Sequence, residues 1–263
     1  MITYGISLQT LIPVRRSPGD KNEMVDQLLF GDFVKVKDSF ENWYLIESVD
    51  DENEGWVDKK QLHNISEETF NQFLTSARFF LTDAFSECIN LKDNTPTRLI
   101  LGSQLPNLRN STLTIEEESF SFNGDFNSLQ RNPDKKQFKA TTQKYLNAPY
   151  LLGGKSPFGI DSSGFVQMVY KLSGVFLKRN SSQQAQQGEL INFINESQLG
   201  DLAFFENEEG NIIHVGIIID NEHIIHAFGK VRIDKIDHNG IFNEQEMRYS
   251  HKLRLLKRIF TEL

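Results

Sequence analysis

The sequence has little cysteine and no long hydrophobic run. Cys88 is the single cysteine among 263 residues, so the chain forms no intramolecular disulfide. It lies in FLTDAFSECINL, where an apolar setting predicts a buried, unreactive side chain. No stretch reaches the roughly 18 apolar residues of a membrane-spanning helix. The N-terminal stretch lacks the basic and apolar segments of a signal peptide, so we expect a cytoplasmic protein.

Positive charge is also in short supply. The chain has 28 Lys and Arg against 36 Asp and Glu, a formal net charge of −8. This balance argues against a nucleic-acid surface and against docking on anionic lipid, so we expect neither nucleic acid nor a membrane as partner. The length suits two or three globular domains.

The first half of the chain alternates short apolar runs with turn signals. In residues 1–65 the runs IPVR, LLFGDFVKV, NWYLI and GWVDKKQL predict a small all-β barrel, and their order resembles a bacterial SH3-like domain. After Ser66, a plausible N-cap, we expect a helix through FNQFLTSARFFLTDAF, followed by further strands. We interpret residues 66–130 as a second, divergent SH3-like domain.

Residues 131–263 place helices before strands, the order of an α+β domain. DKKQFKATTQKYLNAPY predicts a helix that ends before Pro149. FGIDSSGFVQMVYKLSG predicts a Gly-marked turn and an amphipathic helix, and the segment from GDLAFF to KVRID predicts consecutive strands. Ser162 lies at the start of that helix, where unpaired N–H groups and the positive dipole end favour a reactive nucleophile.

Two histidines lie in apolar strands of this region. His214 is in NIIHVGIII and His226 in HIIHAF. If the intervening loop holds an odd number of residues, the rings share one sheet face as diagonal neighbours, and one can orient the other as a base. Two alternatives stay open: satisfied core histidines, or metal ligands together with Asp161. The spacing matches no zinc motif, so we predict no metal and no cofactor.

Four further histidines have polar neighbours, and we predict that they lie at the surface. They are His63, His223, His238 and His251.

Several motifs follow one another in a recognisable order. APYLLGGKSPFGIDSSGFVQMVYK, RNSSQQAQQG, GDLAFF, HVGI and HIIHA resemble the NlpC-type papain-like cysteine peptidases of bacterial cell-wall peptides, over residues 131–263. The resemblance implies a papain-like fold and cleavage of the γ-D-glutamyl to L-diamino-acid bond of murein peptides, in peptide recycling. It implies that the cysteine nucleophile falls on Ser162, the general base on His214 and its orienting residue on His226.

The same resemblance implies a peptide-binding role for three residues. Tyr150, Asp161 and Ser163 match positions that line the peptide site and hold the free amino end of the substrate. The implied partner is a murein-derived peptide that begins with L-Ala-γ-D-Glu.

Serine in the nucleophile position puts activity in doubt. A helix dipole and an imidazolium stabilise a thiolate, but a hydroxyl is too basic to ionise in this way, so we expect little or no hydrolysis. Other departures from the family pattern are Ser7, Leu152, Asn180 and Phe228. Natural divergence and a single Cys→Ser change both fit. The alternatives are a degenerate peptidase that binds murein peptides or a protein partner, and a serine-type hydrolase.

Overall fold

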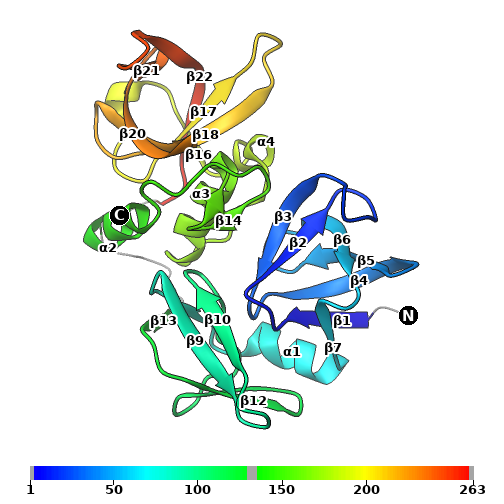
Figure 1. Cartoon of the computed structure of the whole chain (residues 1–263). Helices are drawn as coiled ribbons and strands as arrows, with labels where there is room; N and C mark the ends of the chain where they lie inside the picture. Colours follow the sequence, from blue (N-terminus) through cyan, green and yellow to red (C-terminus); the bar gives the residue numbers. More distant parts are fainter. Residues whose placement is uncertain (1–2, 129–134, 261–263) are drawn as a thin grey trace. The chain divides into compact units, whose positions relative to one another are not determined.

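The structure is a computed structural model that describes residues 3–128 and 135–260. The chain separates into two compact units, residues 1–130 (the first unit) and 131–263 (the second unit). Most elements of both units are strands (Figure 1). Each unit is described by itself.

Seven antiparallel strands build the N-terminal part of the first unit. They are β1 (Thr3–Ser7), β2 (Leu11–Arg15), β3 (Met24–Leu29), β4 (Phe33–Phe40), β5 (Trp43–Ser48), β6 (Glu54–Asp58) and β7 (Leu62–Ile65). Their order in the sheet is β3-β2-β6-β5-β4-β1-β7. Side chains alternate between core and surface, as Ile12 and Val14 show in β2. The expected all-β region is confirmed.

The rest of the first unit is a short helix and six strands. They are α1 (Glu67–Thr75), β8 (Phe79–Leu81), β9 (Phe85–Asn90), β10 (Pro96–Ile100), β11 (Thr112–Ile115), β12 (Glu118–Phe122) and β13 (Phe126–Ser128). Ser66 caps the helix by accepting from the Thr69 N–H. The helix was expected to run to Phe85, and this is wrong: Ser76 is extended, and β8 pairs with β13. Pairing between distant strands overrides the apolar spacing of that segment.

One hydrophobic core spans the predicted domain boundary in this unit. Ile6 and Phe33 on one side of residue 65 belong to the same buried cluster as Phe70, Leu99 and Phe120 on the other. The division into domains at residues 1–65 and 66–130 therefore stays a prediction.

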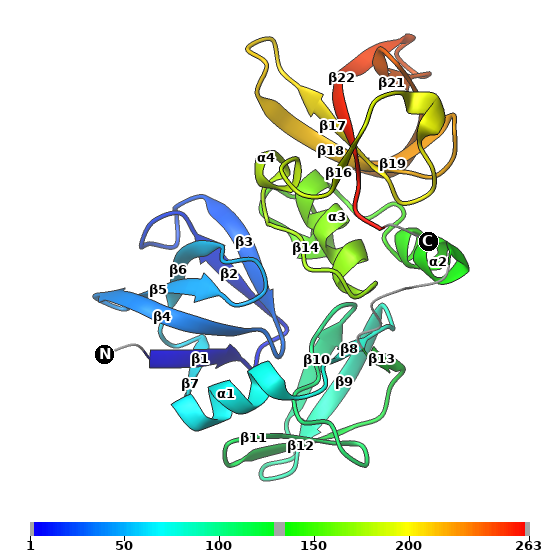
Figure 2. The same cartoon turned by 180° about the vertical axis from the view of Figure 1, so that it is seen from behind.

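The second unit combines helices with a closed barrel. Its elements are α2 (Lys135–Lys144), β14 (Lys155–Ser156), β15 (Gly159–Ile160), α3 (Ser162–Lys171), α4 (Ser181–Gln184), β16 (Glu189–Ile191), the 3₁₀ turn η1 (Ile194–Glu196), β17 (Leu202–Glu206), β18 (Ile212–Ile218), β19 (His223–Phe228), β20 (Lys230–Asp237), β21 (Gly240–Asn243) and β22 (Arg248–Arg258). The sheet order is β16-β22-β17-β18-β19-β20-β21, and β21 also pairs with β22. Strands β17 to β22 thus close on themselves (Figures 1 and 2).

Helix α3 is buried along its whole length. It contacts β18 and β19 on the barrel and also contacts α2. The Tyr170 ring stacks on Phe260 at 5.0 Å and meets Phe138 edge-on at 5.5 Å. The Tyr170 hydroxyl donates to the Gly200 carbonyl. These contacts anchor the last turn of α3 and so help to fix the position of the helix.

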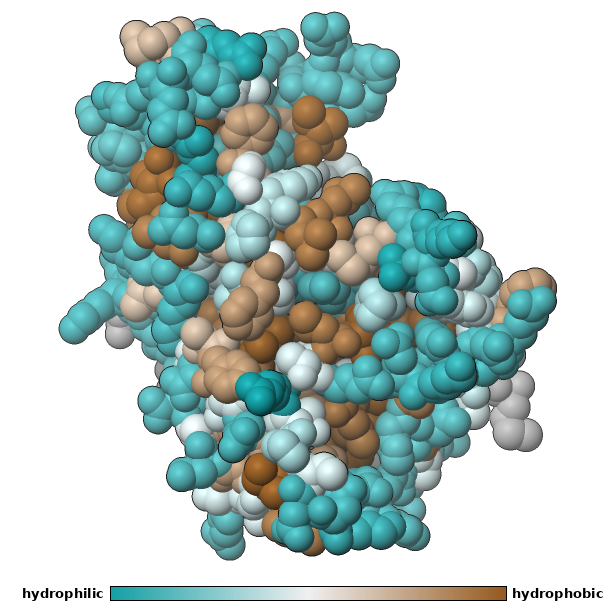
Figure 3. Space-filling view, viewed as in Figure 1, coloured by the Kyte–Doolittle hydropathy of each residue, from teal (hydrophilic) through white to brown (hydrophobic). Residues whose placement is uncertain are grey.

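The face of the molecule seen in Figure 3 is mostly hydrophilic. In the view of Figure 3, hydrophobic residues form small groups among hydrophilic ones. Among the described residues, none of the helices combines the length and hydropathy required to span a membrane.

Candidate active site

The first turn of α3 is built around Asp161. This residue is the N-cap, and its Oδ1 accepts from the Gly164 N–H at 2.7 Å. A side chain at Gly164 would meet the Gly154 carbonyl oxygen at 2.4 Å, so only glycine lets the turn approach this loop. Ser162 is the first residue of the helix and is buried. It therefore lies at the positive end of the helix dipole, as predicted.

The Asp161 carboxylate is fully engaged. Arg179, itself only 1% exposed, donates to both oxygens, at 3.0 and 2.7 Å. The Gly153 N–H donates to Oδ2 at 2.8 Å, and the Ser163 hydroxyl donates to Oδ1 at 3.2 Å. Asp161 thus caps the helix and neutralises a buried guanidinium. It is not part of the histidine group, so the alternative that joined it to His214 and His226 as metal ligands is not supported.

His214 and His226 lie side by side on one barrel face. Gly216 pairs with His226 and Ile218 with Ile224, so an odd number of residues, 219–223, separates the last paired positions. His214 is two residues from Gly216 and shares its face, and the missing side chain at Gly216 leaves room for the Ile224 side chain and the His226 Cβ. His214 Nε2 and His226 Nδ1 are 2.9 Å apart. The predicted pairing of the two histidines is confirmed.

The histidine pair continues into a buried carboxylate. His226 Nε2 lies 2.9 Å from Asp234 Oδ2, and Arg232 donates to Asp234 Oδ1 at 2.7 Å. A carboxylate only accepts, so His226 Nε2 carries a proton, and in the neutral ring Nδ1 accepts. His214 Nε2 then donates to His226. This sequence of hydrogen bonds leaves Nδ1 of His214 unprotonated and able to take a proton.

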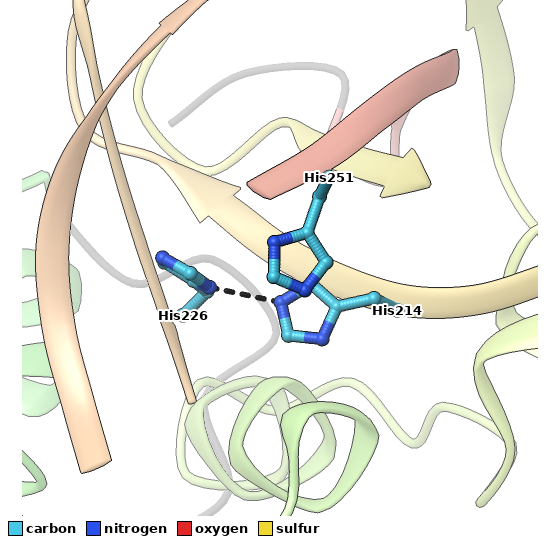
Figure 4. A group of neighbouring side chains, drawn as sticks. All are labelled: His214, His226 and His251. Atoms are coloured by element: carbon cyan, nitrogen blue, oxygen red, sulfur yellow. Dashed lines mark hydrogen bonds between the residues drawn. The ribbon is translucent and has the colours of Figure 1, made fainter. Parts of the chain in front are cut away.

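His251 was expected at the surface, and this is wrong. It comes from β22, and its ring stacks on His214 with centroids 4.1 Å apart (Figure 4). Ile241 opposes it on β21, and the closing of the barrel by β21 and β22 carries it to the other two histidines. The prediction followed the polar residues on either side of His251, in the stretch RYSHK. These residues are polar because one face of β22 is in solvent.

Burial keeps the three imidazoles neutral. It lowers the pKa of His214 well below 6.5, and the proximity of His226 and His251 adds to this effect. Burial also lowers the pKa of His226, although the hydrogen bond with Asp234 works in the other direction. The pKa of His251 falls to about 4, mainly through burial. Lone pairs on ring nitrogens are therefore available near pH 7.

Tyr150 forms an isolated bridge with Ile160, just before the start of α3, and Ser163 lies in the first turn of that helix. The Tyr150 N–H donates to the Gly229 carbonyl at 3.0 Å, while its side chain is 44% exposed. Partial burial, with the Asp161 charge as the next cause, raises the pKa of Tyr150. Ser163 accepts from Arg179 at 2.9 Å. Their roles in peptide binding stay predictions.

Sequence reasoning missed Asp234, Arg232 and Arg179. Asp234 had a local signal: in the hairpin around Gly229, His226 pairs with Arg232, so Asp234 is a diagonal neighbour of His226. Arg179 opens the motif RNSSQQAQQG, but no local signal indicated its pairing with Asp161, which lies 18 residues earlier in the chain.

Two regions of the chain match known protein families. Residues 147–249 match the NlpC/P60 family, and residues 14–62 match the bacterial dipeptidyl-peptidase Sh3 domain. The chain therefore contains an NlpC/P60 domain with a papain-like fold and, before it in the sequence, a bacterial SH3 domain. The resemblance drawn from the sequence motifs is confirmed.

Relatives of this chain are bacterial peptidases by name. The chain is 38% identical over 85 residues to the γ-D-glutamyl-L-lysine dipeptidyl-peptidase of Bacillus subtilis, a match over 32% of this chain and 28% of that protein. It is 24% identical over 249 residues to dipeptidyl-peptidase 6 of Lysinibacillus sphaericus, over 86% and 89% of the two chains. The first-named match thus spans less than a third of that relative.

A solved structure has the same fold. An NlpC/P60 family protein from Bacillus cereus superposes with a TM-score of 0.82 at 19% identity, over 97% of this chain and 99% of that one.

Proposed function

We propose that the second unit carries a peptide-hydrolase site of the cysteine-peptidase type, in which residue 162 holds the nucleophile position. His214 is the general base and His226 orients it. The observation that carries this proposal is the hydrogen-bonded series His214–His226–Asp234, with 2.9 Å at each step. This series leaves Nδ1 of His214 unprotonated, and His214 lies on β18, a strand that packs against α3.

The chemistry follows from that tautomer. A thiol at position 162 gives its proton to Nδ1 of His214, and the sulfur attacks the peptide carbonyl carbon. The N-terminal dipole of α3 favours the thiolate. The protonated His214 then gives the proton to the leaving amine, and water releases the acyl group. With Ser162 the first proton transfer is far less favourable, so the chain binds peptide and cleaves it slowly or not at all.

The proposed substrate is a murein peptide cleaved between γ-D-glutamate and an L-diamino acid. The name of the Bacillus subtilis relative supports this bond type. We assign the free amino end of L-Ala-γ-D-Glu to the surroundings of Tyr150 and Ser163. The oxygens of Asp161 are engaged by Arg179 and backbone N–H groups, so its part in this subsite is to hold the Ser163 hydroxyl in place.

A second candidate is a degenerate peptidase that binds murein peptides or a protein partner. Two departures from the family pattern favour this candidate. Leu152 is 55% and Phe228 40% exposed, so both apolar side chains are accessible to a binding partner. The Phe228 ring meets His251 edge-on at 4.9 Å. A bulky apolar group beside the histidines is consistent with an altered pocket.

The finer domain assignment is also a proposal. We place a second, divergent SH3-like domain at residues 66–130 and class the whole chain as α+β. Support comes from the four-stranded sheet β10-β9-β12-β11 and from the helices that precede the barrel in the second unit.

The test compares the protein with its Ser162→Cys variant on L-Ala-γ-D-Glu-diaminopimelate, following cleavage and binding. We expect only the variant to cleave, with both proteins binding the peptide. The matched control is Ser162→Cys with His214→Ala, which should bind but not cleave. Cleavage that survives loss of His214 would refute the assigned base. Binding without cleavage by Ser162→Cys would favour the degenerate peptidase.

A further inference from the structure

Three histidines from three strands converge at one point of the barrel. One ring nitrogen from each of His214, His226 and His251 lies within 4.8 Å of the other two. Figure 4 shows the His251 ring above the hydrogen bond that joins the other two rings. We propose that this cluster binds a divalent transition metal of the zinc class. The site does not depend on peptidase activity.

In two of the rings, one nitrogen is engaged by a hydrogen-bond partner, and this shows which other nitrogen is the metal ligand. His226 Nε2 is engaged by Asp234 at 2.9 Å, which leaves Nδ1 as the ligand. His251 Nδ1 lies 2.9 Å from the Ser250 hydroxyl. In the tautomer in which that hydroxyl donates to the Ile241 carbonyl, at 3.4 Å, it accepts from His251 Nδ1 and leaves Nε2 with its lone pair. His214 contributes Nε2, the atom that already faces His226.

These outer contacts are those of metal-binding histidines. Such rings generally donate their other N–H to a carboxylate, carbonyl or water, which fixes their orientation. Asp234 serves His226 in this way, and Arg232 holds Asp234 in turn at 2.7 Å. Ser250 serves His251. Imidazole ligands suit zinc, copper and nickel, and three of them leave a fourth position for water.

The spacing needs an adjustment of the rings. At a tetrahedral ion with metal–nitrogen bonds of about 2.1 Å, the ligand nitrogens are about 3.4 Å apart. His214 Nε2 and His226 Nδ1, now 2.9 Å apart, must separate by about half an ångström, and nitrogens at the 4.8 Å limit of the cluster must approach by about 1.4 Å. His251 is only half-buried, so its ring can turn with less repacking than the two rings below it.

Binding has a consequence for His214. The ion takes the place of the proton between His214 Nε2 and His226 Nδ1. A neutral His214 bound through Nε2 holds its own proton on Nδ1. This atom can then no longer accept a proton from residue 162. The metal-bound form and the proton-accepting form exclude each other.

The test uses the full chain with Ser162, freed of metal by a chelator. Zn²⁺ is titrated by calorimetry, and Co²⁺ by the visible absorption of a tetrahedral complex. We expect one ion per chain. His251→Phe keeps the ring stack but removes a ligand, and should weaken binding at least about tenfold. The control is His223→Gln, a half-exposed histidine on the same strand as His226, which should bind like the parent.

Two results would overturn the site. One is equal binding by His251→Phe and by the parent. The other is a parent whose melting temperature is unchanged at saturating Zn²⁺, a measurement that needs no variant. If His251→Phe does not fold, His251→Gln provides the same comparison.

Discussion

The protein's only cysteine and its candidate nucleophile position lie in opposite surroundings. Cys88, on β9, is fully buried among apolar side chains, and burial raises the pKa of its thiol to about 12. Ser162 begins α3, at the positive end of the helix dipole. A thiol lies where a thiolate cannot form, and a hydroxyl lies where a thiolate would be stabilised. Reactivity here depends on position in the fold.

The largest expected effect is on thiol reactivity. In Ser162→Cys, we expect iodoacetamide to alkylate residue 162 about a thousandfold faster than Cys88, because the helix dipole favours the thiolate at residue 162, whereas Cys88 is fully buried and burial raises the pKa of its thiol. Mass spectrometry of each labelled peptide measures both rates in one molecule. The matched control is Ser162→Cys with Cys88→Ala, which should keep the fast rate. Equal, slow labelling of the two thiols would remove the contrast.

The next effect is on stability around position 162. Asp161→Ala removes the helix cap and the counter-charge of buried Arg179, and should lower the free energy of unfolding by about 3–5 kcal/mol. Cys88→Ala removes only one buried atom and should cost about 1 kcal/mol. Urea denaturation monitored by circular dichroism measures both. A cost for Asp161→Ala no larger than that of Cys88→Ala would contradict the structural role of the carboxylate.

A smaller effect concerns the tautomer of His214. In Asp234→Asn, Arg232 holds the amide oxygen, so the amide NH₂ faces His226 Nε2 and reverses the series of hydrogen bonds. Combined with Ser162→Cys, this change should lower kcat about a hundredfold while KM changes little. Kinetics over a range of pH measure the loss. Asp220→Asn, which alters the contact of exposed His223, is the control and should leave the kinetics unchanged.

The sequence revealed the local parts of the site and missed its distant ones. The pairing of His214 with His226 followed from the odd number of residues in one hairpin loop. His251 could not be placed, because its position depends on barrel closure between β21 and β22. The helix after Ser66 was drawn too long for a similar reason, since the pairing of β8 with β13 is decided by distant residues.

The central claim is that the site keeps a proton-accepting His214 although the nucleophile position holds serine. Nitrogen-15 NMR of the imidazole rings tests it in the unaltered protein, freed of metal, at pH 7. The account predicts that His214 is protonated on Nε2 and bare on Nδ1, with His226 protonated on Nε2. A proton on Nδ1 of His214 would contradict it.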